Sequence, residues 1–558
     1  MLHKWKAVEG GGCAGVAGGG DQRRRCVAAS LSMLIAATLA FLAYVAFFPN
    51  DGAGGLYRLW RCQGCAGELG ESPGDEAPAA DGPSPSRAAR EPTTLSHIVF
   101  GIGASARTWD QRRGYAELWW RPDQMRGHVW LDEEPVSPWP AATCPPYRVS
   151  ADASRFGDRA SAARMARIVA DSFLAVAAEL GNDTARDEPR WFVMGDDDTV
   201  FFPDNLVAVL RKYDHGEMYY VGAPSESVEQ DVMHSYGMAF GGGGFAVSYP
   251  AAAALAKAID GCLDRYVYFY GSDQRVQACL TELGVPLTRE PGFHQVDIRG
   301  DAYGMLAAHP VAPLVSLHHL DHIQPISPRG KTALEAVRPL VAASRLDPAR
   351  ALQQSICYQR GPGYVWSVSV AWGYTAQLYP WAVAPHDLEV PLQTFRTWRS
   401  WADGPFVFNT RPLSPRDACA RPAIFFLSAA RNGTATTVTE YARHDAASPP
   451  EKECDRASFR AASTVHTVRV IAPRMSEGDW RRVSAAAAAT GASRDAAMLT
   501  FLCATMFSGP AAAVLQDEAD EMGLGAGGAD TALRPGRAHV AVISSPRQRI
   551  HEDSTAVV

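Results

Sequence analysis

Three adjacent carboxylates interrupt an apolar stretch near the middle of the chain. They are Asp196, Asp197 and Asp198, and apolar residues flank them at 191–194 and 200–202. Like charges held close together away from bulk water repel one another, and a divalent cation is the simplest group that offsets this repulsion. Carboxylate oxygens are ligands that Mg²⁺ and Mn²⁺ prefer. The cluster therefore predicts a metal site.

The neighbouring elements give this cluster two interpretations. The apolar run before it predicts a buried strand at residues 190–195, and open α/β sheets bind ligands at the carboxyl ends of their strands. The structural alternative is a solvated acidic turn, in which Asp198 or Asp204 caps a helix near residues 203–213. The residues of this segment alone leave both interpretations open.

A run of four glycines, Gly241–Gly244, lies inside a second apolar stretch. Glycines remove side chains where another body must come close, and a sugar or a nucleotide is one such body. A bulge or a flexible turn is the structural alternative.

Further polar candidates follow the glycines. Asp273 lies at the start of a predicted helix that reaches Leu283, where a carboxylate also stabilises the helix dipole. His294 and the pair His318-His319 come later. A histidine that reaches a cation bound by aspartates is chemically sensible, although a single histidine is more often structural.

The elements around these candidates predict an α/β layer. Short apolar strands alternate with segments of helical periodicity, which favours a mostly parallel sheet. The predicted strands are 97–103, 127–131, 190–195 and 218–222, and the predicted helices include 112–120 and 160–180.

The N-terminal part of the chain predicts a membrane anchor. Val27–Phe48 is an uncharged run of 22 residues, which is about 33 Å as a helix, and Arg23–Arg25 precede it. The positive-inside rule then leaves residues 1–26 in the cytosol and the body after the anchor in a lumen or outside the cell. A cleaved signal peptide is the alternative. Residues 49–94 include a stretch rich in Gly, Pro, Ala and Ser that predicts a disordered stem.

Composition limits the function classes. The 558 residues are 47% hydrophobic and carry a net charge of −7, which argues against a general nucleic-acid binder. Eight cysteines between Cys62 and Cys454 permit four disulfides in an oxidising compartment. Glycosylation sequons at Asn182 and Asn432 also fit a luminal body, and the layout suits a Golgi enzyme or a surface receptor.

Six motifs in order carry a resemblance over about residues 95–480. The sequence resembles the plant Fringe-related glycosyltransferases, which are similar to the Fringe-type and core-1 β-1,3-glycosyltransferases. The motifs are WFVMGDDDTVFFPDNL, YYVGAPSE, AFGGGGFAVS, YGSDQRV, GFHQVDIRGD and SLHHLD.

The resemblance implies a Rossmann-like nucleotide-diphosphosugar transferase domain of the GT-A type, which we expect at residues 95–334. Strand-like runs at 364–370, 406–408 and 464–471 predict a mostly β accessory region at 335–480. Five tryptophans there could stack on carbohydrate or, as is more common, pack in a core. The atypical segment 481–558 is expected to be disordered.

The resemblance also implies roles for the candidate residues. Asp198 would be the first metal ligand, and Asp196 would contact the metal or the nucleotide ribose. His294 would lie on the metal side, with His318 as the second choice for that role. Asp273 falls where relatives carry the catalytic carboxylate, which takes the proton of the acceptor hydroxyl in an inverting transfer.

Donor contacts are implied for Asp197 and for Gly242 and Gly243, which match the loop beneath the donor sugar. Relatives carry a basic residue and a Thr-Trp pair in the helix after the first strand, where this chain reads AELWW. Arg113 is the substitute that we predict for that donor contact.

The expected function is that of a Golgi type II membrane glycosyltransferase. It would use a UDP-sugar and Mn²⁺ or Mg²⁺, invert the anomeric centre and form a β-1,3 linkage. The acceptor would be a glycan, a glycoprotein, a polysaccharide or a small molecule, and no nucleic acid would take part. The alternatives are a membrane lectin or scaffold on a transferase fold, and a glycoside hydrolase with two carboxylates about 5–10 Å apart.

Overall fold

The computed structural model describes most of the chain after the predicted stem. The described residues are 91–180, 188–361, 363–413, 418–434, 436–444, 454–475 and 539–543. The predicted anchor at 27–48, the sequon at Asn182 and most of the atypical C-terminal segment lie outside them. Among the described helices, none has the length and apolar character needed to cross a bilayer.

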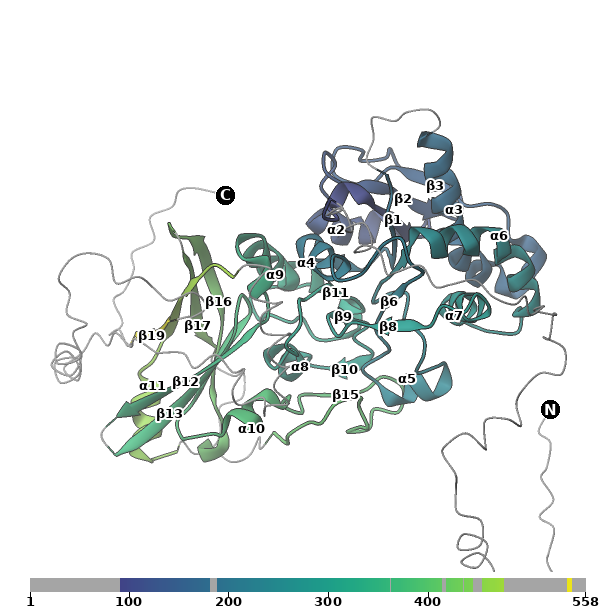
Figure 1. Ribbon diagram of the computed structural model, residues 1–558. Coiled ribbons are helices and arrows are strands. Elements are labelled where there is room, and N and C mark those ends of the chain that lie inside the picture. The colour runs from purple at the N-terminus through teal and green to yellow at the C-terminus, as the bar shows by residue number, and fades with distance from the viewer. Residues whose placement is uncertain are drawn as a thin grey trace, which may run out of the picture. The chain divides into compact units, whose positions relative to one another are not determined.

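A twisted seven-stranded sheet forms the scaffold of the first half of this region (Figure 1). Its strands run in the order β3-β2-β1-β4-β7-β6-β8. Strands β1, β2, β3 and β4 are parallel neighbours, as the alternation of strands and helices predicted. The bounds are β1 Ile98–Gly103, β2 Arg126–Leu131, β3 Tyr147–Val149, β4 Trp191–Asp196, β6 Tyr220–Gly222, β7 Phe245–Ser248 and β8 Leu287–Arg289.

The sheet is mostly parallel, as predicted, with one exception. Strand β7 runs antiparallel to both β4 and β6. A parallel neighbour needs a crossover that returns the chain to the opposite edge of the sheet. Between β6 and β7 there is only the short helix α5 (Val228–Met233) and the loop that contains Gly241–Gly244, which we call the glycine loop. Strand β7 therefore starts near the edge of the sheet where β6 ends.

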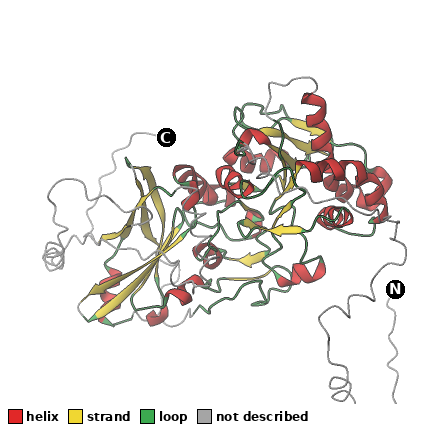
Figure 2. Cartoon of the chain, viewed as in Figure 1, coloured by secondary structure: helices red, strands yellow, loops and turns green. Residues whose placement is uncertain are grey.

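Helices cover both faces of this sheet because successive strand residues point to opposite sides. Val99 packs with helices α3, α6 and α7, whereas Ile98 and Phe100 pack with α2, α4 and α9. Figure 2 shows these helices in red around the strands. The bounds are α2 Trp109–Trp119, α3 Ala160–Leu180, α4 Pro203–Leu210, α6 Tyr249–Arg265, α7 Ser272–Glu282 and α9 Ala333–Leu346.

Two small sheets connect the site to the rest of the fold. Strand β11 (Ser316–Leu317) lies between β5 (Val200–Phe201) and β9 (Phe293–His294). Strand β10 (Ile298–Gly300) pairs with β15 (Phe395–Thr397), and the short helix α8 (Tyr303–Ala307) follows β10. The β5-β11 pairing brings the segment after Leu317 beside the aspartate cluster.

The second half contains an antiparallel sheet, which agrees with the predicted mostly β region. Trp366 and Trp372 are only 2% and 1% exposed in its core, so they are packing residues rather than a carbohydrate platform. The predicted strand at 406–408 is wrong, because only Phe406 makes an isolated bridge. The strands are β12 Gln354–Gly361, β13 Tyr364–Ala371, β14 Thr375–Tyr379, β16 Ala423–Asn432, β17 Thr436–His444, β18 Thr467–Pro473 and β19 His539–Ile543, with short helices α10 Pro385–Glu389 and α11 Ala457–Ser463.

Within the C-terminal segment, residues 539–543 are an exception to the expected disorder, since they form β19 beside β18; the rest of the segment lies outside the described residues. A strand forms there because the outer edge of β18 offers unpaired backbone groups.

The cysteines agree in part with the expected disulfides. Cys262 bonds to Cys279 and Cys419 bonds to Cys454. Cys144 is a buried free thiol in the described part of the chain, so four disulfides do not form among the eight cysteines considered.

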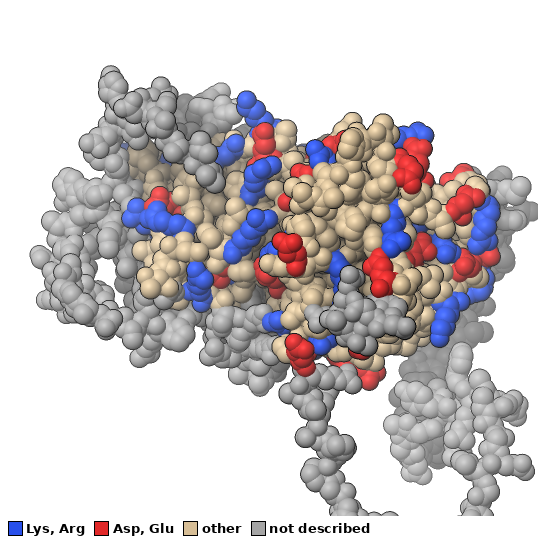
Figure 3. Space-filling view, turned by 90° about the horizontal axis from the view of Figure 1, so that it is seen from above, with Lys and Arg blue, Asp and Glu red and all other residues tan. Residues whose placement is uncertain are grey.

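Charged side chains of both signs are interspersed on the face shown in Figure 3. Ion pairs among the described residues include Arg121 with Asp204 and Arg107 with Glu133. The described residues of this face show no single-sign basic stripe of the kind that is typical of nucleic-acid binding.

Candidate metal and donor site

The aspartate cluster begins where β4 ends, at the carboxyl edge of the central sheet. Asp196 lies opposite Gly103, the last residue of β1. Thr199 closes the turn, because its hydroxyl accepts a hydrogen bond from the Asp196 amide at 2.8 Å and donates one to the Gly242 carbonyl at 2.7 Å. The turn that carries the aspartates is thus tied directly to the glycine loop.

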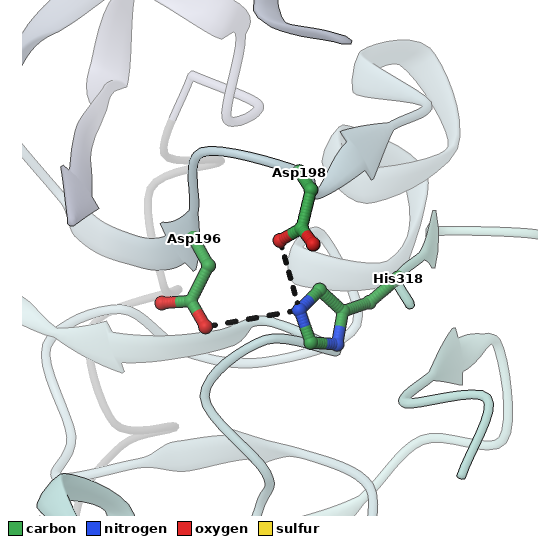
Figure 4. Close-up of side chains that lie close together, drawn as sticks. All are labelled: Asp196, Asp198 and His318. Atoms are coloured by element: carbon green, nitrogen blue, oxygen red, sulfur yellow. Dashed lines mark ion pairs between the residues drawn. The ribbon is translucent and has the colours of Figure 1, made fainter. Parts of the chain in front are cut away.

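His318 faces two of the three aspartates. Its Nε2 atom lies 3.0 Å from Asp198 Oδ1 and 3.8 Å from Asp196 Oδ2, and both carboxylates point toward the ring (Figure 4). One ligand atom from each of the three residues lies within 4.8 Å of the others, which is a spacing that one cation could bridge. His318 directly follows β11, so the β5-β11 pairing sets its position.

The surroundings of Asp196 and Asp198 shift the pKa values of the two carboxylates in opposite directions. Burial opposes ionisation of Asp198, but the charges of His318 and Arg112 outweigh burial and hold its pKa below the ordinary value. Burial raises the pKa of Asp196 to about 7; His318 opposes this rise, and neighbouring carboxylates add to it. Burial would lower the pKa of His318, yet the negative charge of Asp198 raises it to about 9.

These residues fit a divalent cation. Asp198 is 2% exposed, and its Oδ1 atom accepts no hydrogen bond from any described residue, although it faces His318. Two carboxylates and an imidazole form a donor set that suits Mn²⁺ or Mg²⁺ with additional oxygen ligands. A bound cation would supply the charge that such a buried oxygen needs.

Arg112, not Arg113, is the basic residue at this cluster. Its Nη1 atom lies 2.9 Å from Asp197 Oδ1 and 3.4 Å from Asp198 Oδ2. Arg113 instead pairs with Glu117 at 3.1 Å along helix α2. Since consecutive helical residues are turned by about 100° from each other, the neighbouring arginine points elsewhere. The donor contact expected of Arg113 stays a prediction, and Arg112 is the arginine that lies at the aspartates.

His294 does not join the metal cluster. Its Nδ1 atom lies 3.1 Å from Glu226 Oε1 and its Nε2 atom lies 2.9 Å from His309 Nε2. The structure therefore replaces our first choice for the metal-side histidine with the second, His318. His294 on β9 is paired in register with Leu317, the last residue of β11, and His318 directly follows that strand.

The glycine loop separates His318 from Asp273. A Cβ atom on Gly242 would lie only 2.1 Å from His318 Cε1, and one on Gly241 would lie 2.7 Å from Asp273 Oδ1. Gly243 is held by a hydrogen bond of 2.6 Å from its amide to Gln295 Oε1. The run is thus a place of close approach, as its composition predicted.

Asp273 is the second residue of α7, and its carboxylate reaches the glycine loop. Ser272 donates a hydrogen bond of 2.9 Å to Asp273 Oδ1. Burial raises its pKa, against the lowering effect of hydrogen bonds from the Gly241 backbone and Ser272. The geometry therefore combines a candidate cation site and a carboxylate of raised basicity on the two sides of one loop.

Sequence reasoning missed Arg112, Thr199 and Gln295. Thr199 could have been found from its place next to the aspartates, since a hydroxyl in an acidic turn commonly bonds to the backbone. Gln295 gave no local signal, because its role depends on a segment 52 residues away in the chain.

Comparison with known families agrees with this arrangement. The family described as Fringe-like matches residues 152–302, which include the aspartate cluster, the glycine loop and Asp273. The family described as "Protein of unknown function, DUF604" matches residues 230–488, which include His318 and much of the second sheet. No curated protein matches the chain. Together, the overlapping matches support a Fringe-related family for this chain.

Proposed function

We propose that this protein is a metal-dependent glycosyltransferase that transfers a sugar from a UDP-sugar to a hydroxyl acceptor with inversion. The observation that carries the proposal is the approach of His318 to Asp198 at 3.0 Å, with Asp196 beside them. The coarser part, glycosyl transfer, follows from the Fringe-like match, and the site supports the finer part.

Asp196, Asp198 and His318 would hold the cation, which we propose to be Mn²⁺ or Mg²⁺. When bound, such a cation supplies Lewis-acid stabilisation to the diphosphate of the leaving nucleotide. Arg112 contacts Asp197 and would hold the acidic turn in place, and its positive charge would favour an anionic donor. The glycine loop, which we expect to lie beneath the donor sugar, lets His318 and Asp273 approach from its two sides.

Asp273 would act on the acceptor. Its carboxylate takes the proton of the acceptor hydroxyl as the oxygen attacks C1 of the donor sugar, and no covalent intermediate is needed. Its raised pKa makes it a stronger base than an exposed aspartate. The acceptor class is a glycan, a glycoprotein, a polysaccharide or a small molecule, and a β-1,3 linkage is the family expectation.

We further propose that the protein is a single-pass type II protein of the Golgi membrane, with the anchor at residues 27–48 and the transferase in the lumen. The disulfides Cys262–Cys279 and Cys419–Cys454 support an oxidising compartment. Asn432 is exposed at the end of β16, where a glycan could be attached.

Calorimetric titration of UDP into the full-length chain tests the proposal. We expect binding with Mn²⁺, loss of binding with EDTA, and loss in Asp198→Asn. The matched control is Asp204→Asn, which removes a carboxylate from a surface ion pair with Arg121. Turnover of a panel of UDP-sugars then identifies the donor. A folded chain that binds no UDP would favour a lectin or scaffold instead.

A further inference from the structure

A buried chain of hydrogen bonds lies behind the glycine loop, apart from the aspartate cluster. Glu226, His294 and His309 are each 6% exposed or less. Glu226 Oε1 lies 3.1 Å from His294 Nδ1, and His294 Nε2 lies 2.9 Å from His309 Nε2. His309 Nδ1 ends the chain at the carbonyl of Pro310, at 2.7 Å.

The donors and acceptors of this series of hydrogen bonds indicate which ring nitrogens carry a proton. A carbonyl only accepts, so His309 Nδ1 donates to Pro310. Burial keeps the pKa of His309 well below the ordinary value, so this ring is neutral and its Nε2 atom accepts from His294. The contact of His294 Nδ1 with Glu226 Oε1, at 3.1 Å, is then a hydrogen bond that needs one proton between the two atoms. A glutamine at position 226 could donate to the same nitrogen from its amide.

The second carboxylate oxygen of Glu226 holds a strained turn. Glu226 Oε2 accepts hydrogen bonds from the amides of Val296, at 2.8 Å, and Asp297, at 3.3 Å. Val296 has φ of 58°, in the left-handed region where a β-branched residue is strained. Such a conformation persists only when its surroundings hold it, and it is typical of functional sites.

This turn, at residues 294–297, contacts the glycine loop. Gln295 lies between His294 and Val296, and its Oε1 atom accepts a hydrogen bond from the Gly243 amide at 2.6 Å. Ser316 donates a hydrogen bond to the Gly243 carbonyl. A Cβ atom on Gly243 would lie 3.1 Å from the Gln295 amide nitrogen, so loop and turn are in direct contact.

We propose that Glu226 is a positioning residue of the transferase site: through His294 and the turn at 294–297, it sets Gln295 so that the glycine loop stays in place between His318 and Asp273. Its effect on catalysis rests on the proposed function, whereas its hold on the loop does not. The carboxylate of Glu226 touches neither the aspartate cluster nor Asp273 in the structure described; it acts through the turn.

The test compares two substitutions at one position with a matched control. Glu226→Ala removes both oxygens, whereas Glu226→Gln keeps an acceptor for the turn and a donor for His294. Glu290→Ala is the control, because Glu290 is also buried, at 5% exposed, but pairs with Lys212 at 2.9 Å and holds a different segment. Melting temperatures report any general loss of stability in all three.

Hydrogen exchange of the full-length chain measures directly how well the amides of the glycine loop are protected. For Glu226→Ala we expect at least a tenfold faster exchange of the Gly243 amide, with Glu226→Gln close to wild type and Glu290→Ala unchanged at this site. Gln295→Ala, which removes only the acceptor for Gly243, should reproduce the faster exchange. If Glu226→Ala fails to fold, the same comparison is made with Gln295→Ala.

Nucleotide binding separates this inference from the proposed function. Loss of a residue that orients a metal or donor site typically costs about 10-fold to 100-fold. We therefore expect Glu226→Ala to raise the Kd for UDP with Mn²⁺ and the KM for the donor by about that factor, with a smaller effect on kcat. If the wild type binds UDP and Glu226→Ala matches Glu290→Ala in exchange and affinity, the inference is overturned. If the wild type binds no UDP, the proposed function fails, and the exchange result alone decides whether Glu226 holds the loop.

Discussion

Gly242 leaves the space that the ring of His318 occupies, since a Cβ atom at this glycine would lie 2.1 Å from His318 Cε1. This relationship ties the glycine loop to the residues that we expect to hold the cation. It also explains why position 242 is a glycine, because even alanine would place a Cβ atom against the ring.

Gly242→Ala should therefore damage the site more than the fold. The added methyl forces His318 away from Asp198, and overpacking of this kind costs about 1–3 kcal/mol of unfolding free energy. We expect UDP binding in the presence of Mn²⁺ to be lost in calorimetry while the far-ultraviolet circular dichroism is retained. Unchanged affinity would show that His318 is not needed for binding.

Gly261→Ala is the matched control and should have the opposite effect on stability. Gly261 lies exposed in the interior of helix α6, where an added Cβ meets only Arg265 Nη1, at 3.4 Å. Replacing such a glycine by alanine stabilises a helix by about 0.5–1 kcal/mol. Urea unfolding measures the gain, and a loss of stability would contradict the helix environment described.

Asp273→Asn should reduce turnover and spare nucleotide binding. Loss of a general base costs about 10²-fold to 10⁴-fold in rate. The raised pKa of Asp273 also predicts the sign of the pH dependence, because the base must be ionised. Turnover should fall as the pH drops, with a midpoint above the value for an exposed aspartate. A pH profile of kcat/KM checks this, and full activity of Asp273→Asn would rule out the role.

Arg112→Ala and Arg113→Ala should differ although the residues are adjacent. Arg112 bonds to the buried carboxylate of Asp197, and such charged hydrogen bonds contribute about 1–3 kcal/mol. Arg113 makes an exposed pair with Glu117, which is worth about 0.5 kcal/mol. Urea unfolding at neutral pH should separate the two variants in this order, and equal effects would speak against the contact of Arg112 with the cluster.

The disulfide Cys262–Cys279 should stabilise the position of Asp273, because it joins α6 to the helix that carries this residue. The cysteines are 17 positions apart, and a loop of this size corresponds to about 3 kcal/mol of stabilisation. The double substitution of both cysteines by serine should lower the melting temperature and donor turnover together. Equal melting temperatures would show that the crosslink adds nothing.

The central strands and the aspartate cluster could be predicted because their signals are local. Residues 191–196 form β4 and the carboxylates follow at its end, as an apolar run with an acidic end suggests. Helix α3 spans Ala160–Leu180, with the bounds that its periodicity predicted. The direction of β7 could not be read in this way, because it depends on which end of the sheet the chain has reached.

The choice between two histidines is likewise not local. His294 lies on β9, whereas His318 follows β11, which lies between β9 and β5, so the pairing of distant segments decides which ring faces Asp198. The contact of Arg112 with the aspartates depends on the rotation of helix α2 about its axis, and the contact of Gln295 depends on the glycine loop. Tertiary packing sets all three of these contacts, and the residue pattern of a single segment does not encode it.

Binding of Mn²⁺ to the full-length chain, followed by electron paramagnetic resonance with and without UDP, tests the central claim most directly. The account predicts that the wild type binds Mn²⁺, that UDP strengthens this binding, and that Asp198→Asn and His318→Ala each lose it, while Asp204→Asn binds as the wild type does. Equal Mn²⁺ binding by the wild type, Asp198→Asn and His318→Ala would contradict a cation site at Asp198 and His318.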